Sequence, residues 1–222
     1  MHVIWYTAMS MDGRLAGPGD DLGFLESIGT EDGDEFADFL AGIDALIVGA
    51  QTIRWLEREG HGSLPADGKP IWVLTHDEDL AGRMAQGGHP VTRREGDIGA
   101  VLDEIAAAGH GRVWICGGGN VAGQLLAADR VDEVVLTIAP VALGGSPAIF
   151  EGEGLAANRF TLQECRPYAA NAVRLRWTRP RNPECSHVRE SGKWVDGAES
   201  LESGEAAIQC HHARAVFHGE RG

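Results

Sequence analysis

The sequence is short of positive charge. Of its 222 residues, 19 are Lys or Arg and 33 are Asp or Glu, which gives a formal net charge of −14. Nucleic acids and anionic membrane surfaces both require clustered Lys and Arg. We therefore expect neither as a partner. An anionic ligand would have to be held by local groups, such as the N-terminus of a helix.

Long apolar runs are also missing, since none approaches the roughly 20 residues that a membrane-spanning helix needs. Residues 1–6 lack the basic region of a signal peptide and begin a strand pattern at once. Cysteine is scarce as well, and its spacing suggests no disulfide framework. These absences lead us to expect a protein of the reducing cytoplasm with no membrane span. The four cysteines are Cys116, Cys165, Cys185 and Cys210.

A hydrophobic content of 43% nevertheless predicts a packed core. Strand and helix patterns alternate over the first two thirds of the chain, and strands dominate afterwards. This order predicts one α/β domain over residues 1–180, with a sheet that is parallel in the middle and antiparallel at its end. The expected strands are 2–9, 45–48, 70–75, 89–92, 113–116, 131–138, 160–166 and 172–178. The expected helices are 34–40, 51–58, 97–108 and the stretch after Gly119.

The last of these strands alternates between apolar and basic residues. Val173, Leu175 and Trp177 are interleaved with Arg174 and Arg176. Such alternation is typical of an antiparallel strand with one face toward solvent. It predicts an antiparallel hairpin at the edge of the sheet.

After Pro180 the composition changes to Gly, Ser, Glu and His without sustained periodicity. We expect residues 181–222 to form a disordered tail. The alternative is a zinc site built from two Cys-His groups, but adjacent ligands cannot easily all face one ion. We therefore expect no metal. The residues of that alternative are Cys185, His187, Cys210, His211 and His212.

The most informative stretch is Val113–Leu126. A continuous apolar run is followed by Gly117, Gly118 and Gly119, and then by a helical pattern. Missing Cβ atoms let a ligand approach the backbone, and the free N–H groups of the first helical turn point at an anion. This pattern predicts a site for the pyrophosphate of a dinucleotide. The alternative is a tight turn without a ligand, since the full glycine fingerprint is absent.

A second apolar run, residues 45–48, also ends at a glycine, Gly49, and leads into a helix. Two such strands, adjacent in a parallel sheet, would form a crevice at their carboxyl ends, where α/β proteins bind ligands. No nucleophile–base pair stands out elsewhere in the sequence. The absence of such a pair favours a reductase over a hydrolase. The tryptophans are expected in the core and in pocket walls: Trp5, Trp55, Trp72 and Trp114.

Four segments in order resemble one family. Ser10–Ala16 is similar to its S-L-D-G-K-I-A, Leu46–Thr52 to its V-G-x-x-T, and Val131–Gly145 to its V-D-E, A-P and L-G-G. The glycine turn at 117–119 with Leu125 and Leu126 is the fourth. The chain therefore resembles the dihydrofolate reductase-like superfamily, most closely the branch with the reductase domain of riboflavin biosynthesis.

The resemblance implies an α/β fold with a mostly parallel central sheet, flanking helices and a C-terminal antiparallel hairpin. It implies NADPH as cofactor and hydride transfer to a C=N or C=O group of a small heterocycle, as in 5-amino-6-(5-phosphoribosylamino)uracil reductase. It also implies a homodimer. The family usually uses an acidic-proline element and an arginine here for its substrate, and residues 53–59 lack that proline. The alternative is therefore a non-catalytic nucleotide-binding protein that keeps the fold.

The resemblance also implies a set of cofactor residues. The glycine turn would meet the pyrophosphate, and Thr52 would meet it from the other side. The residues implied for the pyrophosphate are Gly49, Thr52, Gly117, Gly118, Gly119 and Asn120; Ala8 is implied for the nicotinamide; and Thr75, His76 and Arg54 are implied for the adenosine 2′-phosphate.

Two acidic residues are candidates for polar groups near the substrate. Asp12 follows the first strand and would contact substrate or relay a proton. The alternative is a turn aspartate that caps Gly13 and Arg14. For Glu133 we favour a solvent-facing position in its strand over a substrate role.

Overall fold

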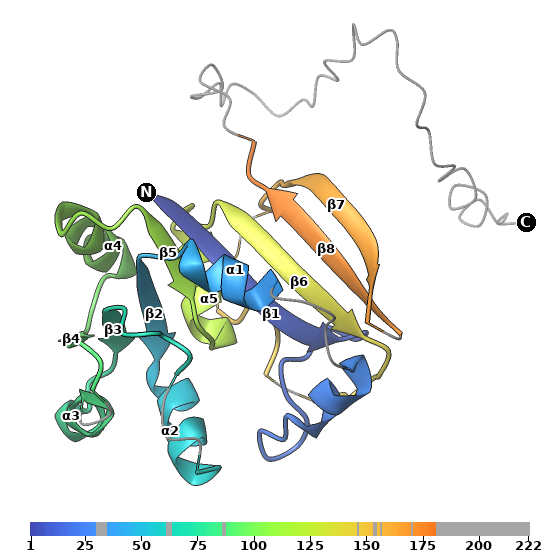
Figure 1. Cartoon of the computed structure of the whole chain (residues 1–222), viewed down its shortest axis with the longest axis horizontal. Helices are drawn as coiled ribbons and strands as arrows, with labels where there is room; N and C mark the ends of the chain where they lie inside the picture. The colour runs from blue at the N-terminus through green and yellow to red at the C-terminus, as the bar shows by residue number, and fades with distance from the viewer. Residues whose placement is uncertain are drawn as a thin grey trace, which may run out of the picture. The chain divides into compact units, whose positions relative to one another are not determined.

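The structure is a computed structural model that describes residues 1–29, 35–60, 64–85, 88–145, 147–152, 155, 157–169 and 171–180. In this part of the chain, eight strands form one sheet in the order β4-β3-β2-β5-β1-β6-β8-β7 (Figure 1). Neighbours from β4 to β6 are parallel, and the pairs β6–β8 and β8–β7 are antiparallel. The expected mixed sheet with a C-terminal hairpin is therefore confirmed. The strands are β1 (His2–Ser10), β2 (Ala45–Gly49), β3 (Ile71–Leu74), β4 (Val91–Arg94), β5 (Arg112–Ile115), β6 (Glu133–Ala139), β7 (Thr161–Tyr168) and β8 (Ala172–Thr178).

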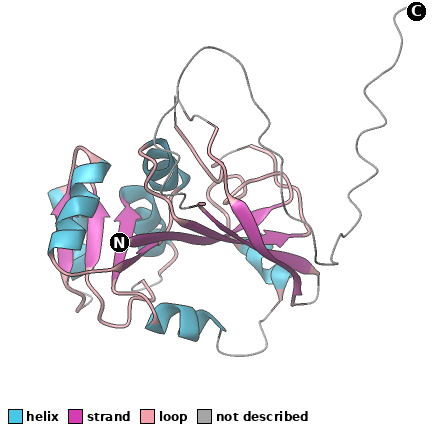
Figure 2. Ribbon diagram, turned by 90° about the horizontal axis from the view of Figure 1, so that it is seen from above, coloured by secondary structure: helices cyan, strands magenta, loops and turns pink. Residues whose placement is uncertain are grey.

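Helices cover both faces of this sheet (Figure 2). Apolar residues of α4 and α5 pack on one face, and those of α1, α2 and α3 pack on the other. Central strands are therefore buried on both sides, which explains why residues 45–48 are apolar without alternation. The helices are α1 (Glu35–Ala41), α2 (Ala50–Arg58), α3 (Glu78–Ala85), α4 (Ile98–Ala107), α5 (Gly119–Ala127) and the short 3₁₀ helix η1 (Gly23–Ile28).

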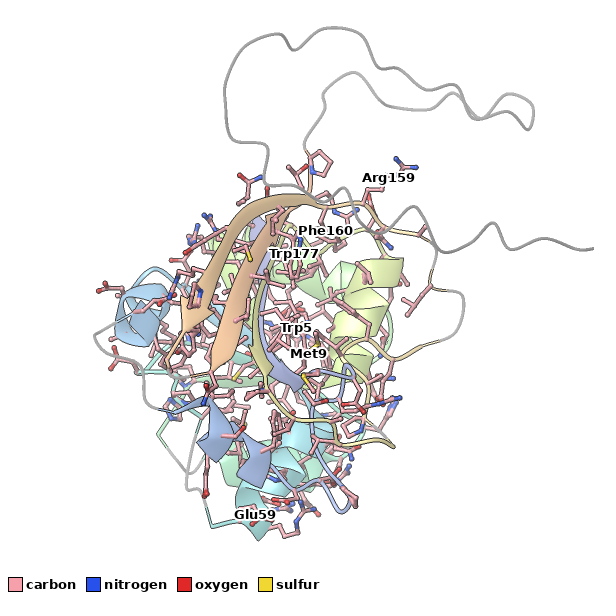
Figure 3. The ribbon with its side chains drawn as sticks, turned by 90° about the vertical axis from the view of Figure 1, so that its right-hand side faces the viewer. Trp5, Met9, Glu59, Arg159, Phe160 and Trp177 are labelled. Carbon is pink, nitrogen blue, oxygen red and sulfur yellow. The ribbon has the colours of Figure 1, made fainter. Side chains whose placement is uncertain are left out.

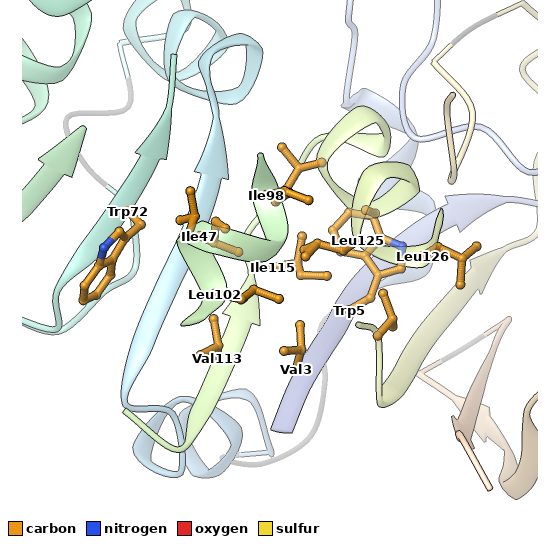
Figure 4. Packing of buried hydrophobic residues seen from close by; sticks show 14 of the residues in the cluster. Val3, Trp5, Ile47, Trp72, Ile98, Leu102, Val113, Ile115, Leu125 and Leu126 are labelled. Atoms are coloured by element: carbon orange, nitrogen blue, oxygen red, sulfur yellow. The ribbon is translucent and has the colours of Figure 1, made fainter. Parts of the chain in front are cut away.

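The core under α4 and α5 is a continuous apolar layer. Leu102 of α4 and Leu125 of α5 are fully buried against Ile47, Ile115 and Trp5 of the sheet (Figure 4). The layer extends to the hairpin, where the partly buried side chains of Phe160 and Trp177 pack against it (Figure 3). Close packing of this kind holds the ends of the central strands in fixed positions.

Strand order brings the two glycine turns together. Ala45 pairs with Val113 and Ile47 with Ile115, so β2 and β5 are parallel neighbours. Each strand ends at glycine and leads directly into a helix, α2 after β2 and α5 after β5. The adjacency expected from the sequence is confirmed.

Burial in the antiparallel part differs from the sequence pattern. On β8, Arg174 is 3% exposed, whereas Val173 is 39% exposed. The expectation that Glu133 faces solvent is wrong, because it is 6% exposed. The Glu133 carboxylate lies between β1 and β8, 2.7 Å from His2 Nε2 and 2.6 Å from Arg176 Nε. The charge of Arg176 and the hydrogen bond with His2 offset the cost of burying this carboxylate.

Two elements were not expected from the sequence, η1 and α3, both of which are short. Asp34, the first residue of the expected helix 34–40, lies outside the described residues, as do the tail 181–222 and the alternative zinc ligands. Among the described residues, no helix is long and apolar enough to cross a membrane. The same residues include no group of three His, Cys, Asp or Glu side chains that could hold a metal ion.

Candidate functional site

The two glycine turns interlock with the helices that follow them. Gly117 and Gly118 have φ angles of 108° and 93°, a region that favours glycine. A Cβ on Gly117 would lie 2.8 Å from Thr52 Oγ1 on α2, and a Cβ on Gly49 would lie 2.9 Å from Val121 Cγ2 on α5. Glycine at 49 and 117 is therefore required for the turns to pack together.

The N-termini of α2 and α5 lie beside these turns. The N-cap residues of α2 and α5 are Gly49 and Gly118, and neither makes a side-chain capping bond. The N-caps of the outer helices are different, because Asp77 accepts from Leu80 N–H on α3 and Asp97 accepts from Ala100 N–H on α4. Among the described residues, no N-cap side chain accepts from the first N–H groups of α2 or α5, and both dipoles favour an anion there. We call this pair of N-termini, with Thr52, the glycine clamp.

A groove runs along the clamp in two adjoining chambers. An outer chamber of about 600 Å³ extends toward the ends of β3 and β4, and an inner chamber of about 470 Å³ extends toward β1. Gln51, Thr52, Gly118 and Asn120 line both chambers. The clamp therefore lies between the two chambers, which we together call the groove.

The inner chamber lies beside the part of β1 that extends beyond its pairing with β5. The pairing of β1 with β5 ends at Trp5–Ile115, whereas its pairing with β6 continues to Ser10–Ala139. The edge of β1 at Thr7 and Ala8 consequently lines the chamber. Leu15 and Trp55 line the same chamber, and Trp55 Nε1 donates to the carbonyl of Asp20 at 2.9 Å. The chamber suits a flat ring held between apolar walls and a backbone edge.

A third cavity of about 340 Å³, the side chamber, shares Thr7, Ala8 and Leu25 with the inner chamber. Its walls carry four aromatic rings, which favour stacking with another flat ring. Arg174 and Thr137 add polar groups to the wall. The rings are those of Tyr6, Phe36, Trp114 and Tyr168.

Arg174 is fixed on every side. Its Nε donates to Thr137 Oγ1 at 3.0 Å, and its Nη1 donates to Glu35 Oε1 at 2.5 Å. The guanidinium carbon lies 3.8 Å from the ring centroid of Tyr168 and 5.0 Å from that of Tyr6. A buried cation with these partners is held rigidly, and it places a fixed charged group in the wall of the side chamber. Sequence reasoning missed this residue, because its alternation with apolar neighbours indicated exposure.

The predicted cofactor residues all line this groove. The outer chamber is lined by Gly49, Thr52, Arg54, Thr75, His76, Gly118 and Asn120, and the inner chamber is lined by Ala8, Gly117 and Gly119 among others. Their contact with a cofactor stays a prediction. At Gly119 the structure adds a packing reason for glycine, because a Cβ there would lie 2.1 Å from the carbonyl oxygen of Ala148.

Asp12, the predicted catalytic residue, lies outside the lining of the groove. Its carboxylate accepts from Ser10 Oγ at 2.5 Å and from the backbone N–H groups of Leu143 and Gly144 at 3.0 and 2.7 Å. The Ser10 hydroxyl, followed by these two N–H groups, lowers the pKa of Asp12 from its ordinary 3.8 to about 2. Asp12 lines none of the three chambers. These contacts differ from the turn alternative, because the N–H groups of Gly13 and Arg14 donate to Ser10. The catalytic role of Asp12 stays a prediction.

Comparison with known proteins agrees with this architecture. The family model of the RibD C-terminal domain matches residues 1–173. The uncharacterized protein YwjB of Bacillus subtilis is 25% identical over 147 residues, which cover 66% of this chain and 81% of that protein.

Solved structures share the fold. A putative riboflavin biosynthesis protein from Shewanella sp. PV-4 has a TM-score of 0.69 at 24% identity, over 82% of this chain and 100% of that one. A pyrimidine reductase-like protein from Corynebacterium diphtheriae has a TM-score of 0.60 at 16% identity, over 82% and 92%. A diaminohydroxyphosphoribosylaminopyrimidine deaminase/5-amino-6-(5-phosphoribosylamino)uracil reductase from Thermotoga maritima has a TM-score of 0.59 at 14% identity, over 81% and 56%.

Proposed function

The chain belongs to the RibD C-terminal domain family, and from this membership and the groove we propose that it reduces a small planar heterocycle with a nicotinamide dinucleotide. The family points to a reductase-type enzyme of the riboflavin pathway kind. The observation that carries the proposal is that each of the three chambers shares lining residues with the next one. A phosphate site, a slot for a flat ring and an aromatic cavity follow one another along the edge of the sheet.

The glycine clamp fits a pyrophosphate. A Cβ at position 117 would fill the space against Thr52, and the glycine N-caps of α2 and α5 leave first-turn N–H groups for an anion. The pyrophosphate and the nicotinamide are common to NADPH and NADH, so the proposal covers both reduced dinucleotides. NADPH is the one that the family resemblance implies.

In this proposal the protein binds and orients the two reactants. The clamp fixes the dinucleotide by its phosphates, and Ala8, Leu15 and Trp55 confine the ring in the inner chamber. A bound reduced nicotinamide would supply the hydride. Arg174 and Thr137 hydrogen-bond an acceptor heterocycle in the side chamber, whose aromatic walls keep water from its faces. The boundary between the chambers, at Thr7 and Ala8, is where donor and acceptor rings meet.

A second candidate function is a non-catalytic nucleotide-binding protein. The contacts of Asp12 favour this second function. A carboxylate that accepts three hydrogen bonds and has a lowered pKa cannot deliver a proton at neutral pH. The clamp and the inner chamber would still bind a dinucleotide in this case.

One experiment separates the two. Quenching of tryptophan fluorescence by NADH and NADPH measures binding, because Trp55 lines the inner chamber. Loss of nicotinamide absorbance with a panel of pyrimidine, pterin and quinone acceptors then measures turnover. Binding with turnover supports the reductase. Binding without turnover of any acceptor favours the non-catalytic protein, and a failure to bind either dinucleotide at sub-millimolar concentration rejects both.

A further inference from the structure

The outer end of the groove differs in charge from the glycine clamp. Besides the clamp residues, the outer chamber is lined by two carboxylates, those of Asp77 and Glu95, and by the cationic or ionisable side chains of Arg54 and His76. The carboxylates follow the carboxyl ends of β3 and β4. In a dinucleotide whose pyrophosphate lies in the clamp and whose nicotinamide lies in the inner chamber, the adenosine ribose extends toward this end.

On the β3 side, Asp77 binds both groups that could attract a phosphate, the N-terminus of α3 and the guanidinium of Arg54. One of its oxygens accepts from the N–H of Leu80 at 3.0 Å, and the other lies 3.3 Å from Arg54 Nη2. The bond from Leu80, followed by that from Arg54, lowers the pKa of Asp77. The carboxylate is therefore ionised at neutral pH. It occupies the N-terminus of α3 and pairs with the arginine that a phosphate would need.

On the β4 side, Glu95 likewise pairs with basic side chains. Its carboxylate lies 2.6 Å from His76 Nδ1 and 3.7 Å from Arg93 Nη1. Arg93 also binds Glu78 at 3.0 Å. The cationic side chains that the structure describes around this end thus each have a carboxylate partner.

The two ends of the groove therefore suit different chemical groups. The clamp offers first-turn N–H donors, which a pyrophosphate requires, and its N-caps Gly49 and Gly118 carry no side-chain acceptor. The outer end offers carboxylates, which accept hydrogen bonds from ribose hydroxyls, as acidic residues do in sites for NAD. A phosphate monoester carries a charge of about −1.5 to −2 at pH 7. At the outer end it would have to displace Asp77 or Glu95 from a cation and would then lie beside that carboxylate.

We propose that the outer chamber selects a dinucleotide whose adenosine ribose has a free 2′-hydroxyl, so that NADH binds in preference to NADPH. Asp77 and Glu95 are the residues that determine this specificity. The inference rests on the proposed function, since it concerns the cofactor of the same groove. It differs from what the family resemblance implies, because the 2′-phosphate of NADPH does not fit the charges present.

Calorimetric titration of the whole protein with NADH and with NADPH tests the proposal without requiring a substrate. We expect NADH to bind at least about tenfold more tightly, a difference of about 1.4 kcal/mol. Because Asp77 and Glu95 are solvent-accessible, higher ionic strength screens them, and the gap should narrow as salt is added.

Two variants assign the effect to the named carboxylates. Asp77→Asn keeps a side-chain oxygen for the N-cap of α3 but removes the charge. It should raise the affinity for NADPH and leave that for NADH unchanged or weaker. Glu95→Gln should act in the same direction. Asp103→Asn is the matched control, because it removes one exposed carboxylate of α4 that lies outside the groove lining, and it should not change the ratio of the two affinities.

The outcomes separate this inference from the proposed function. If the wild-type protein binds NADPH as tightly as NADH or more tightly, the inference is wrong and the proposed reductase stands. If NADH is preferred but neither Asp77→Asn nor Glu95→Gln alters the ratio relative to Asp103→Asn, the assignment to these carboxylates is wrong. If neither dinucleotide binds, both proposals fail.

Discussion

The hydroxyl of Thr52 lies so close to Gly117 that a Cβ on the glycine would be 2.8 Å from Thr52 Oγ1. Thr52 belongs to the first turn of α2, and Gly117 to the turn between β5 and α5. The two sides of the glycine clamp are therefore packed against each other before any ligand arrives. A site built in this way does not need to reorganise to accept a phosphate.

Gly117→Ala should weaken dinucleotide binding by at least about tenfold, since the methyl group would push Thr52 out of the clamp. The control is Gly109→Ala. Gly109 has a similar φ angle of 91°, but a Cβ there would meet no atom within 4 Å. Gly109→Ala should cost stability, about 1–2 kcal/mol for the left-handed conformation, and leave binding unchanged. Equal affinity in the two variants would show that contact with Thr52 does not matter.

Gly123→Ala should destabilise the fold by about 1–3 kcal/mol or more, as an overpacked core does. A Cβ at this position of α5 would lie 1.8 Å from the carbonyl oxygen of Glu151, so the segment at 147–152 would have to move. Gly82→Ala in α3 is the matched control. Nothing lies within 4 Å of a Cβ there, and an alanine inside a helix should stabilise by up to about 1 kcal/mol. Urea unfolding of both variants measures the difference, and similar results would contradict the packing described.

The stability contributed by Asp12 should depend on pH. Its pKa is lowered from 3.8 to about 2, chiefly by the Ser10 hydroxyl and then by the N–H groups of Leu143 and Gly144. A lowered pKa in the folded state means that the contribution is present above about pH 4 and is lost as the pH falls toward 2. Asp12→Asn should therefore be less stable than the wild type at pH 7, and the gap should close between pH 4 and pH 2. A gap that stays constant through this range would contradict the assignment.

Arg174→Lys should lower kcat/KM for a heterocyclic acceptor by about tenfold or more, because lysine loses the planar fork that binds Thr137 and Glu35. The Kd for the dinucleotide should stay the same, since Arg174 lines only the side chamber. Arg176→Lys on the same strand is the control, as Arg176 binds Glu133 and lines none of the chambers. If Arg174→Lys alters dinucleotide binding and turnover alike, the two chambers do not have separate roles.

The parts that sequence reasoning predicted depend on local signals. An apolar run that ends in glycine before a helical pattern identifies its own turn, so Gly49 and Gly117 could be placed from the chain alone. Parallel strands covered on both faces are apolar throughout, and they were found for the same reason. Thr75 and His76, which follow β3, were assigned only through the family resemblance, and they line the outer chamber.

The side chamber could not be predicted, because it depends on contacts between distant segments. Arg174 binds Thr137, 37 positions away, and Glu35, 139 positions away. Burial of an arginine becomes possible only when such partners and the rings of Tyr6 and Tyr168 surround it. The burial of Glu133 could not be predicted for the same reason, because its partners His2 and Arg176 come from other strands. Alternation shows which residues share a face of a strand but not what covers that face.

The most direct test of the central claim is a crystal structure of the protein grown with NADH. The account predicts that the pyrophosphate lies in the glycine clamp, within hydrogen-bond distance of first-turn N–H groups of α2 and α5, with the nicotinamide beside Ala8 and the adenosine ribose toward Asp77. A dinucleotide bound elsewhere, or one whose phosphates avoid the clamp, would contradict it.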